Sequence, residues 1–257
     1  MSESVRTDME FAADAAWRAG RVTLRYFQTG VTVERKEDDS PVTVADREAE
    51  SCIRELVARA YPQDGLVGEE FGEQAGRSGR RWFIDPIDGT KSFVQGVPLY
   101  GVLIGLQAAS GMVTAGAVYF PGMDELVYAG RDEGCWWNGR PCRVSEVSTL
   151  REACVCYTSQ PSFAEEGKHD VWTAISKRAK VVRGWGDCYG HILVATGRAE
   201  AMFDPVISPW DCGPLPVILG EAGGTFTDWK GESTLFGDDA FSTNGYLFDE
   251  VRRHLSH

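Results

Sequence analysis

The sequence predicts an α/β protein built of two lobes that share one cleft. Three observations support this fold class. Residues 5–27 and 43–60 carry apolar side chains at helical spacing, residues 66–144 contain short apolar runs separated by glycine, and the residues after 150 alternate between strand-like and helical patterns. We expect an N-terminal α+β lobe over residues 1–150 and a C-terminal α/β lobe over residues 151–257. A chain of 257 residues is long enough for one large α/β unit or for two closely packed halves.

Two helices are predicted near the N-terminus. From Val5 to Phe27 apolar residues recur at three- and four-residue intervals, which indicates an amphipathic helix. The second helix begins after Thr43, because its hydroxyl is followed three positions later by the carboxylate of Asp46, the spacing of a capping box. Helical spacing then continues to Ala60, and Pro62 follows. Asp46 is therefore expected in the first turn of this helix.

The middle and C-terminal parts of the chain are expected to supply two groups of strands. The first group comprises Trp82–Ile84, Tyr100–Leu106, Val113–Phe120 and Leu126–Tyr128. The second group comprises Ala153–Tyr157, Val181–Val182 and Ala201–Phe203, with helices expected at His169–Lys177, Tyr189–Thr196 and Pro209–Glu221.

Composition excludes several classes of partner. The formal charge of −12, from 38 acidic and 26 basic residues, repels nucleic acids and anionic membranes, so neither is an expected partner. A phosphate ester would be repelled too, unless a bound divalent cation offsets the charge locally. The seven cysteines are scattered without paired C-x-x-C spacing, which suggests a reducing cytoplasm rather than a disulfide framework. The first residues carry no apolar run of the secretory type.

The segment Trp82-Phe-Ile-Asp-Pro-Ile-Asp-Gly-Thr-Lys91 is the most informative in the chain. An apolar strand ends here in two carboxylates, Asp85 and Asp88, and a rigid element holds ligands well. Gly89 permits a tight turn, and Thr90 adds a hydroxyl and a candidate helix N-terminus. Hard divalent cations such as Mg²⁺ prefer oxygen ligands of this kind.

An alternative interpretation treats Asp-Pro-Ile-Asp-Gly as an ordinary acidic turn, because aspartate, proline and glycine are all turn residues. Two further acidic clusters favour a site. Glu70 follows the short apolar run Leu66-Val67, and Asp211 in Pro209-Trp-Asp211 precedes a helical stretch. Each cluster again places a carboxylate at the end of a predicted strand or the start of a predicted helix.

Together these segments resemble the signatures of the inositol monophosphatase family. The matching motifs are Gly68-Glu-Glu70, Trp82-Phe-Ile-Asp-Pro-Ile-Asp-Gly-Thr90, Pro209-Trp-Asp211 with Ala222-Gly-Gly224, and Lys36 with Pro41-Val-Thr-Val-Ala-Asp46. They occur in the family's order and span nearly the whole chain. The resemblance implies a layered α-β-α-β-α sugar-phosphatase fold, a homodimer and a Mg²⁺-dependent phosphomonoesterase with two to three ions per site, for which Mn²⁺ could substitute.

The resemblance also implies a role for each matching residue. Glu70, Asp85 and the Ile87 carbonyl would hold a first metal, and Asp85, Asp88 and Asp211 a second. A metal-activated water would attack phosphorus in line, with no covalent phosphoenzyme. Thr90, paired with Asp46, would orient or deprotonate that water, and Glu70 would help to hold it. Backbone amides near Gly89 and Thr90 would bind phosphate oxygens.

The C-terminal half resembles the histidinol-phosphatase branch of the family. Arg183-Gly-Trp-Gly-Asp-Cys-Tyr-Gly190 places an aspartate, Asp187, and an aromatic residue, Tyr189, where inositol monophosphatases have small residues. L-Histidinol phosphate carries an ammonium and a protonatable imidazole, and carboxylates at Asp187 and Asp204 would favour such cations. The alternatives are that Asp187 caps the following helix and that Asp204, before Pro205, is a turn residue.

Two other functions stay open at this level. The first is an inositol-1-monophosphatase or another sugar-phosphate phosphatase that uses the same metals. The second is a catalytically silent binding or regulatory protein with the same fold, although the full set of metal carboxylates plus Thr90 argues against it. The four histidines lack metal-ligand spacing, and His191 is the one near Asp187.

Overall fold

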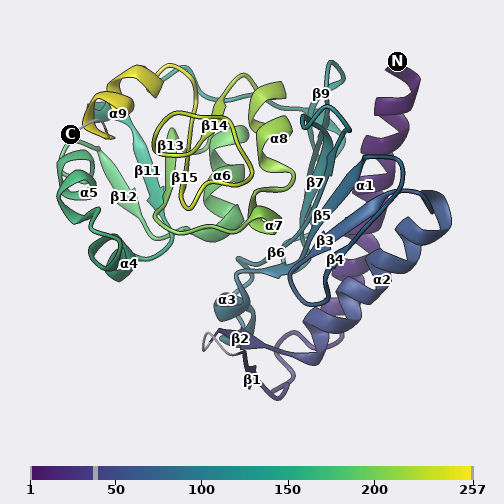
Figure 1. Ribbon diagram of the computed structural model, residues 1–257. Coiled ribbons are helices and arrows are strands. Elements are labelled where there is room, and N and C mark those ends of the chain that lie inside the picture. Colours follow the sequence, from purple (N-terminus) through teal and green to yellow (C-terminus); the bar gives the residue numbers. More distant parts are fainter. Residues whose placement is uncertain (1, 37–39, 256–257) are drawn as a thin grey trace.

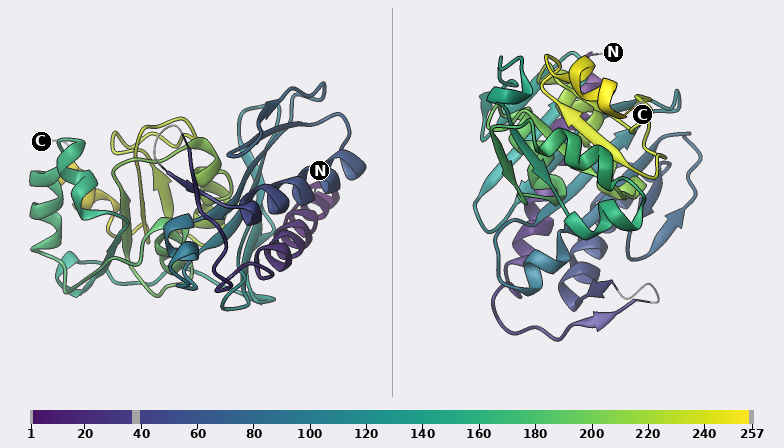
Figure 2. Two further views of the ribbon diagram at one scale, coloured as in Figure 1. Left: turned by 90° about the horizontal axis from the view of Figure 1, so that it is seen from below. Right: turned by 90° about the vertical axis from the view of Figure 1, so that its left-hand side faces the viewer.

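The computed structural model describes residues 2–36 and 40–255. Helices and sheets alternate in five layers, in the order α-β-α-β-α (Figure 1). The left view in Figure 2 keeps the same order, with the N-terminal helix and the C-terminal helix on opposite outer layers. This architecture confirms the predicted fold class. No helix within the described ranges is long and apolar enough to cross a membrane.

The first sheet has eight strands. Its order is β10-β9-β8-β7-β6-β5-β3-β4, and β3 and β5 are parallel while the other neighbours are antiparallel. The strands are β3 (Gly65–Gly68), β4 (Gly72–Gln74), β5 (Arg81–Asp88), β6 (Gly101–Gln107), β7 (Val113–Phe120), β8 (Glu125–Gly130), β9 (Gly134–Trp137) and β10 (Arg140–Pro141). A separate two-stranded sheet pairs β1 (Glu34–Arg35) with β2 (Pro41–Val42).

Two N-terminal helices cover one face of the first sheet. α1 (Ser2–Thr23) packs on β6, β7 and β8, and α2 (Val44–Ala60) packs on α1 and β5 (Figure 1). The capping box predicted from Thr43 and Asp46 is present at the start of α2. The core on this side includes Trp82 and Ile84 of β5, both fully buried.

The second sheet has five strands, in the order β12-β11-β13-β15-β14. They are β11 (Cys154–Tyr157), β12 (Val181–Arg183), β13 (Ala201–Asp204), β14 (Thr225–Thr227) and β15 (Ala240–Thr243). Its outer face is covered by α4 (Gln160–Glu165), α5 (His169–Ser176) and α9 (Phe248–Leu255), and a short 3₁₀ helix, Leu150–Glu152, precedes β11. The lobe boundary at residue 150 stays a prediction.

The middle layer lies between the two sheets. It contains α6 (Asp187–Ala195), α7 (Pro209–Cys212) and α8 (Leu215–Glu221), with α6 on the second sheet and α8 in contact with both sheets. The short α3 (Thr90–Val94) follows β5. The aspartates named above are carried by this layer, by its flanking strands or by the first turn of α2, and Glu70 lies in the turn between β3 and β4.

Two sequence-based boundaries were wrong for identifiable reasons. The single helix predicted over Pro209–Glu221 is broken into α7 and α8, because the ring of Pro214 removes a backbone donor and Gly213 packs directly on β6. A Cβ atom on Gly105 of β6 would lie 2.1 Å from the carbonyl carbon of Gly213, so the two backbones touch. The helix predicted from Tyr189 starts two residues earlier, at Asp187.

Candidate metal centre and active site

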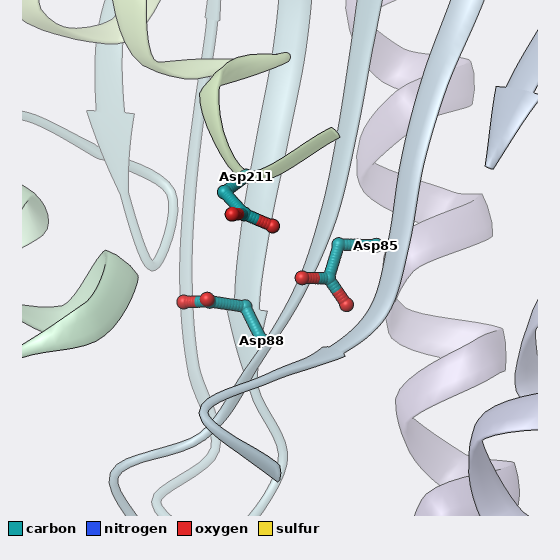
Figure 3. Close-up of side chains that lie close together, drawn as sticks. All are labelled: Asp85, Asp88 and Asp211. Atoms are coloured by element: carbon teal, nitrogen blue, oxygen red, sulfur yellow. The ribbon is translucent and has the colours of Figure 1, made fainter. Parts of the chain in front are cut away.

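Three carboxylates converge where the first sheet meets the middle layer. Asp85 and Asp88 extend from β5 and Asp211 extends from α7, and one oxygen from each lies within 4.8 Å of the others. Figure 3 shows the three side chains close together, with Asp211 above Asp85 and Asp88. The turn interpretation of Asp-Pro-Ile-Asp is wrong, because β5 continues through Asp88 with a shift in register between Asp85 and Asp88. That irregularity lets two residues three positions apart face the same point.

Backbone N–H groups hold each of the three carboxylates. Ile87 N donates to Asp85 Oδ1 over 2.9 Å, and Ser208 N donates to Asp211 Oδ2 over 3.0 Å. Cys188 N, from α6, donates to Asp88 Oδ2 over 2.5 Å. Cys188, in the second half of the chain, therefore fixes the side chain of Asp88 on β5.

In the metal-free protein the pKa values of all three carboxyl groups are raised. Burial is the largest cause in each case. The pKa of Asp88 rises to about 8, with the charge of Asp211 as the next cause, and the pKa of Asp211 rises to about 7. The pKa of Asp85 rises well above its usual range through burial and then through the charges of Glu69, Asp88 and Asp211. Clustered acids that repel one another in this way suit a divalent cation with oxygen ligands.

Glu70, in the turn after β3, is paired with Lys36. Lys36 Nζ is 2.7 Å from Oε1 of Glu70 and 2.7 Å from Oε1 of Glu69. These two hydrogen bonds raise the pKa of Lys36, although burial opposes them. Burial raises the pKa of Glu70 to about 7, and Lys36 opposes that rise. Because Glu69 also raises the pKa of Asp85, Glu69 is a charged neighbour of the site that sequence reasoning did not single out.

Glu50 was also missed from the sequence. It is fully buried in α2, and Oε2 accepts the backbone N–H of Glu70 over 2.7 Å. Its Oε1 accepts from Arg54 Nε over 2.7 Å. A Cβ atom on Gly68 would lie 2.1 Å from Glu50 Oε1, so glycine is required where β3 ends. The sequence shows Glu50 and Arg54 only as an i, i+4 pair, which is typical of a solvent-exposed ion pair.

Thr90 and Asp46, which the resemblance pairs, each have other hydrogen-bond partners. Thr90 Oγ1 donates to the Ile87 carbonyl over 2.9 Å. Asp46 Oδ2 accepts from Thr43 N over 2.8 Å and from Thr43 Oγ1 over 2.7 Å, as its capping role requires. The other oxygen, Asp46 Oδ1, is buried and has no hydrogen-bond partner among the described residues. Burial raises the pKa of Asp46 to about 6.

Gly89 brings the Asp85–Thr90 segment against Asp187. Its φ of 82° lies in the left-handed region that glycine tolerates, and a Cβ atom there would lie 3.1 Å from Asp187 Oδ2. Asp187 is the first residue of α6, and Gly186 takes the cap position without a side-chain bond, so the capping interpretation of Asp187 is wrong. The pKa of Asp187 is raised well above its usual range by burial and by the charges of Asp88 and Asp204, against the opposing charge of Lys91.

Asp204 is the last residue of β13 rather than a turn residue. Its Oδ2 is 2.8 Å from His191 Nε2, and its Oδ1 accepts from the Thr158 hydroxyl. A cavity of about 50 Å³ joins this region to the carboxylate cluster. Its lining comprises Asp88, Thr158, Asp187, Cys188, His191, Asp204, Val206, Ile207 and Asp211.

Among the described residues, Tyr189 is not one of those that line this cavity. Its ring packs edge-on against Phe120 at 5.1 Å between centroids, and the Arg198 guanidinium lies 5.7 Å from the ring centroid. Tyr189 is thus part of the packing between α6 and the first sheet. Thr158 and His191, which sequence reasoning did not assign to the site, line the cavity instead.

Comparisons with known proteins agree with this geometry. The model of the inositol monophosphatase family matches residues 4–253. The histidinol-phosphatase of Chlorobaculum parvum is 44% identical over 242 residues, covering 93% of each chain, and that of Mycobacterium tuberculosis is 36% identical over 97% of this chain and 98% of its own. Among solved structures, the extragenic suppressor protein suhB of Bartonella henselae superposes with a TM-score of 0.90 at 28% identity, covering 97% of this chain and 98% of its own. The chain therefore belongs to the inositol monophosphatase family.

Proposed function

We propose that this phosphoric monoester hydrolase converts L-histidinol phosphate to L-histidinol and phosphate in a Mg²⁺-dependent reaction. One observation carries the choice of substrate. The cavity beside the metal-ligand candidates Asp88 and Asp211 is also lined by two further carboxylates, Asp187 and Asp204. A substrate with an anionic phosphate at one end and a cationic amino alcohol at the other fits these two sets of acids. The names of the two bacterial relatives support the same choice.

The donor set fits a hard divalent cation. Asp85, Asp88 and Asp211 would hold Mg²⁺, with Glu70 and the Ile87 carbonyl as the further ligands that the family resemblance implies. When bound, Mg²⁺ supplies positive charge that neutralises the phosphate and acidifies a water molecule. Glu70 would have to leave Lys36, at least in part, to join this set. Ile87 O accepts one hydrogen bond from Thr90 and has a second lone pair for a cation.

The residues after β5 would orient the phosphate and the water. The backbone N–H groups of Gly89 and Thr90 follow directly after Asp88, where a phosphate bound next to the acids would lie. Asp46 Oδ1 is a buried acceptor with no partner in the part of the chain that the structure describes. A Thr90 hydroxyl that donates its proton to this oxygen would keep its own lone pairs free to accept a hydrogen bond from a water. We infer that Thr90 exchanges its bond to Ile87 O for one to Asp46 Oδ1 in the working enzyme.

Asp187 and Asp204 would receive the cationic end of the substrate. Each oxygen of Asp204 already takes part in one hydrogen bond, and a carboxylate oxygen has a second lone pair for an ammonium. The charge of a bound cation would lower the raised pKa of Asp187 and favour its ionised form. Inositol phosphates have no positive charge to gain from these acids, so they are the second candidate substrates.

A substrate panel tests the proposal. Phosphate release from L-histidinol phosphate, myo-inositol 1-phosphate and 4-nitrophenyl phosphate is measured with Mg²⁺ and with excess chelator. We expect release to require Mg²⁺, and kcat/KM to be highest for L-histidinol phosphate. Asp187→Asn and Asp204→Asn should lower kcat/KM for that ester about tenfold or more relative to the aryl ester, as loss of a charge-assisted hydrogen bond predicts. Equal turnover of the inositol and histidinol esters would reject the substrate assignment.

Three further features belong to the same proposal. Mn²⁺ should substitute for Mg²⁺, because it accepts the same oxygen ligands. A homodimer and a cytoplasmic location follow from the family resemblance and from the cysteine content. Light scattering of the purified protein at several concentrations tests the dimer, which a monomeric mass would exclude. Complete loss of Mg²⁺-dependent release from every ester would instead favour a binding protein.

A further inference from the structure

His191 lies at the centre of a hydrogen-bond network between the second sheet and the candidate active site. It lies in the middle of α6, its exposed fraction is 0%, and both ring nitrogens have partners. Nε2 is 2.8 Å from Asp204 Oδ2, and Nδ1 is 2.9 Å from Ser242 Oγ. A fully buried imidazole with two defined partners has one fixed orientation.

Strand register explains why these residues meet. Met202 pairs with Ser242 across β13 and β15, so Asp204, two residues beyond Met202, lies on the same face as Ser242. Tyr157 pairs with Phe203 across the parallel strands β11 and β13, so Thr158 lies next to Asp204 where both strands end. α6 covers this face, and the ring of His191 packs edge-on against Phe226 of β14.

The donors can be assigned from chemistry. An ionised carboxylate accepts hydrogen bonds only, so His191 must carry its proton on Nε2 to bond Asp204 Oδ2. In the neutral ring Nδ1 is then an acceptor, and the Ser242 hydroxyl donates to it. The Thr158 hydroxyl donates to the other oxygen, Asp204 Oδ1. Both oxygens of Asp204 are thus fixed by side-chain donors, one from His191 and one from Thr158.

The network continues to the second acid of the cavity. Asp187 N donates to Thr158 Oγ1 over 2.8 Å, so the hydroxyl that fixes Asp204 also holds the first residue of α6. Asp187 has a φ of 54°, a left-handed conformation that is uncommon for a residue other than glycine, and this bond helps to maintain it. The distance between the two acids is therefore set by one chain of bonds from Ser242 to Asp187.

We propose that His191 is a positioning residue for substrate specificity, which fixes Asp204 directly and Asp187 through Thr158 so that both acids meet the cationic end of the substrate. This inference rests on the proposed function. A buried histidine that only filled the core would need no carboxylate partner at the cavity. His191 instead bonds Asp204, and both residues line the cavity together with Asp88 and Asp211.

Two variants at position 191 separate positioning from packing. His191→Phe keeps a ring of similar size against Phe226 but removes the donor to Asp204. His191→Gln places a side-chain amide N–H at about the position of Nε2 and retains that donor. Each variant is assayed with Mg²⁺ on L-histidinol phosphate and on 4-nitrophenyl phosphate, and the ratio of the two kcat/KM values is compared with that of the wild-type enzyme.

We expect His191→Phe to lower this ratio about tenfold, mainly through a higher KM for L-histidinol phosphate, and His191→Gln to recover most of the loss. A folding defect lowers the active fraction for both esters alike, so it leaves the ratio unchanged. An unchanged ratio for His191→Phe, or a glutamine variant no better than phenylalanine, would overturn the proposal. The ratio in the wild-type enzyme tests the proposed substrate separately.

A spectroscopic measurement tests the network without any substrate. Long-range ¹H–¹⁵N correlation spectra of the wild-type protein should show the His191 ring protonated at Nε2, with Nδ1 an unprotonated acceptor. A neutral ring protonated at Nδ1 would overturn the proposal, because such a ring cannot donate to Asp204. This result is independent of which phosphate ester the enzyme prefers.

Discussion

Replacing Asp88 with asparagine should stabilise the metal-free protein while it weakens the enzyme. Burial and the charge of Asp211 raise the pKa of Asp88 to about 8, whereas an aspartate in the unfolded chain has a pKa of about 3.9. A carboxyl group whose pKa is raised in the folded state favours folding at low pH, and this contribution is lost as the pH rises toward 8. The asparagine side chain keeps an oxygen for the Cys188 N–H and carries no charge.

The size of the effect follows from the number of like charges. Asp88 is one of three carboxylates whose oxygens lie within 4.8 Å, and removing one charge should recover about 1–3 kcal/mol of unfolding free energy at pH 8. For a chain of this length that corresponds to a rise in Tm of about 3–10 °C. At pH 5, only about one unit above the pKa of 3.9 in the unfolded chain, most of this penalty is absent, so the difference should be much smaller than at pH 8.

Thermal melts in excess chelator at pH 5 and pH 8 measure this difference. Asp238→Asn, at an exposed position outside the cavity lining, is the matched control and should leave Tm nearly unchanged. Added Mg²⁺ should raise the Tm of the wild-type protein more than that of Asp88→Asn, because a ligand that binds only the folded state stabilises it. A metal-free Asp88→Asn protein that melts below wild type at pH 8 would refute the reasoning, as would an undiminished response to Mg²⁺.

Two further predictions concern residues that support the site. Glu50→Ala removes the acceptor for Glu70 N and the partner of Arg54, so it should lower the free energy of unfolding in urea by about 3–5 kcal/mol and reduce turnover of the aryl ester. An unchanged free energy of unfolding in Glu50→Ala would show that Glu50 does not hold the turn that carries Glu70. Gly89→Ala should lower both stability and turnover, because its φ is 82° and its Cβ would lie 3.1 Å from Asp187 Oδ2. Gly111→Ala has a similar φ of 88° with nothing within 4 Å of the new Cβ, so only a larger loss of turnover in Gly89→Ala supports the contact with Asp187.

The metal-ligand candidates could be predicted because each lies in a local motif. Asp85 and Asp88 end an apolar strand, and Asp211 follows Ser208 and Pro209 at a helix start, so residue types within a few positions define them. The capping box of α2 was predicted for the same reason. In each case the sequence motif and the structural feature that it predicts lie within the same four to eight residues.

The other contacts around the candidate site depend on how strands that are distant in sequence pair with one another. His191 meets Ser242 because β13 pairs with β15, and no local pattern encodes that pairing. Tyr189 was assigned to the substrate because the resemblance to the histidinol-phosphatase branch rests on an aromatic residue at this position, but on a helix a residue two positions from Asp187 points to a different face. Its ring therefore packs on Phe120 rather than in the cavity.

Backbone donors explain how the acidic cluster can be rigid and still keep its oxygens available to a cation. Asp85, Asp88 and Asp211 each accept a neutral N–H, from Ile87, Cys188 and Ser208. Within the described ranges, none of these three carboxylates forms an ion pair with a lysine, arginine or histidine. A basic side chain would lower the repulsion, but it would also compete with a metal for the same oxygens. Neutral donors fix the geometry and leave the charge for a cation, and because Cys188 belongs to α6, that geometry also requires both sheets to be packed on the middle layer.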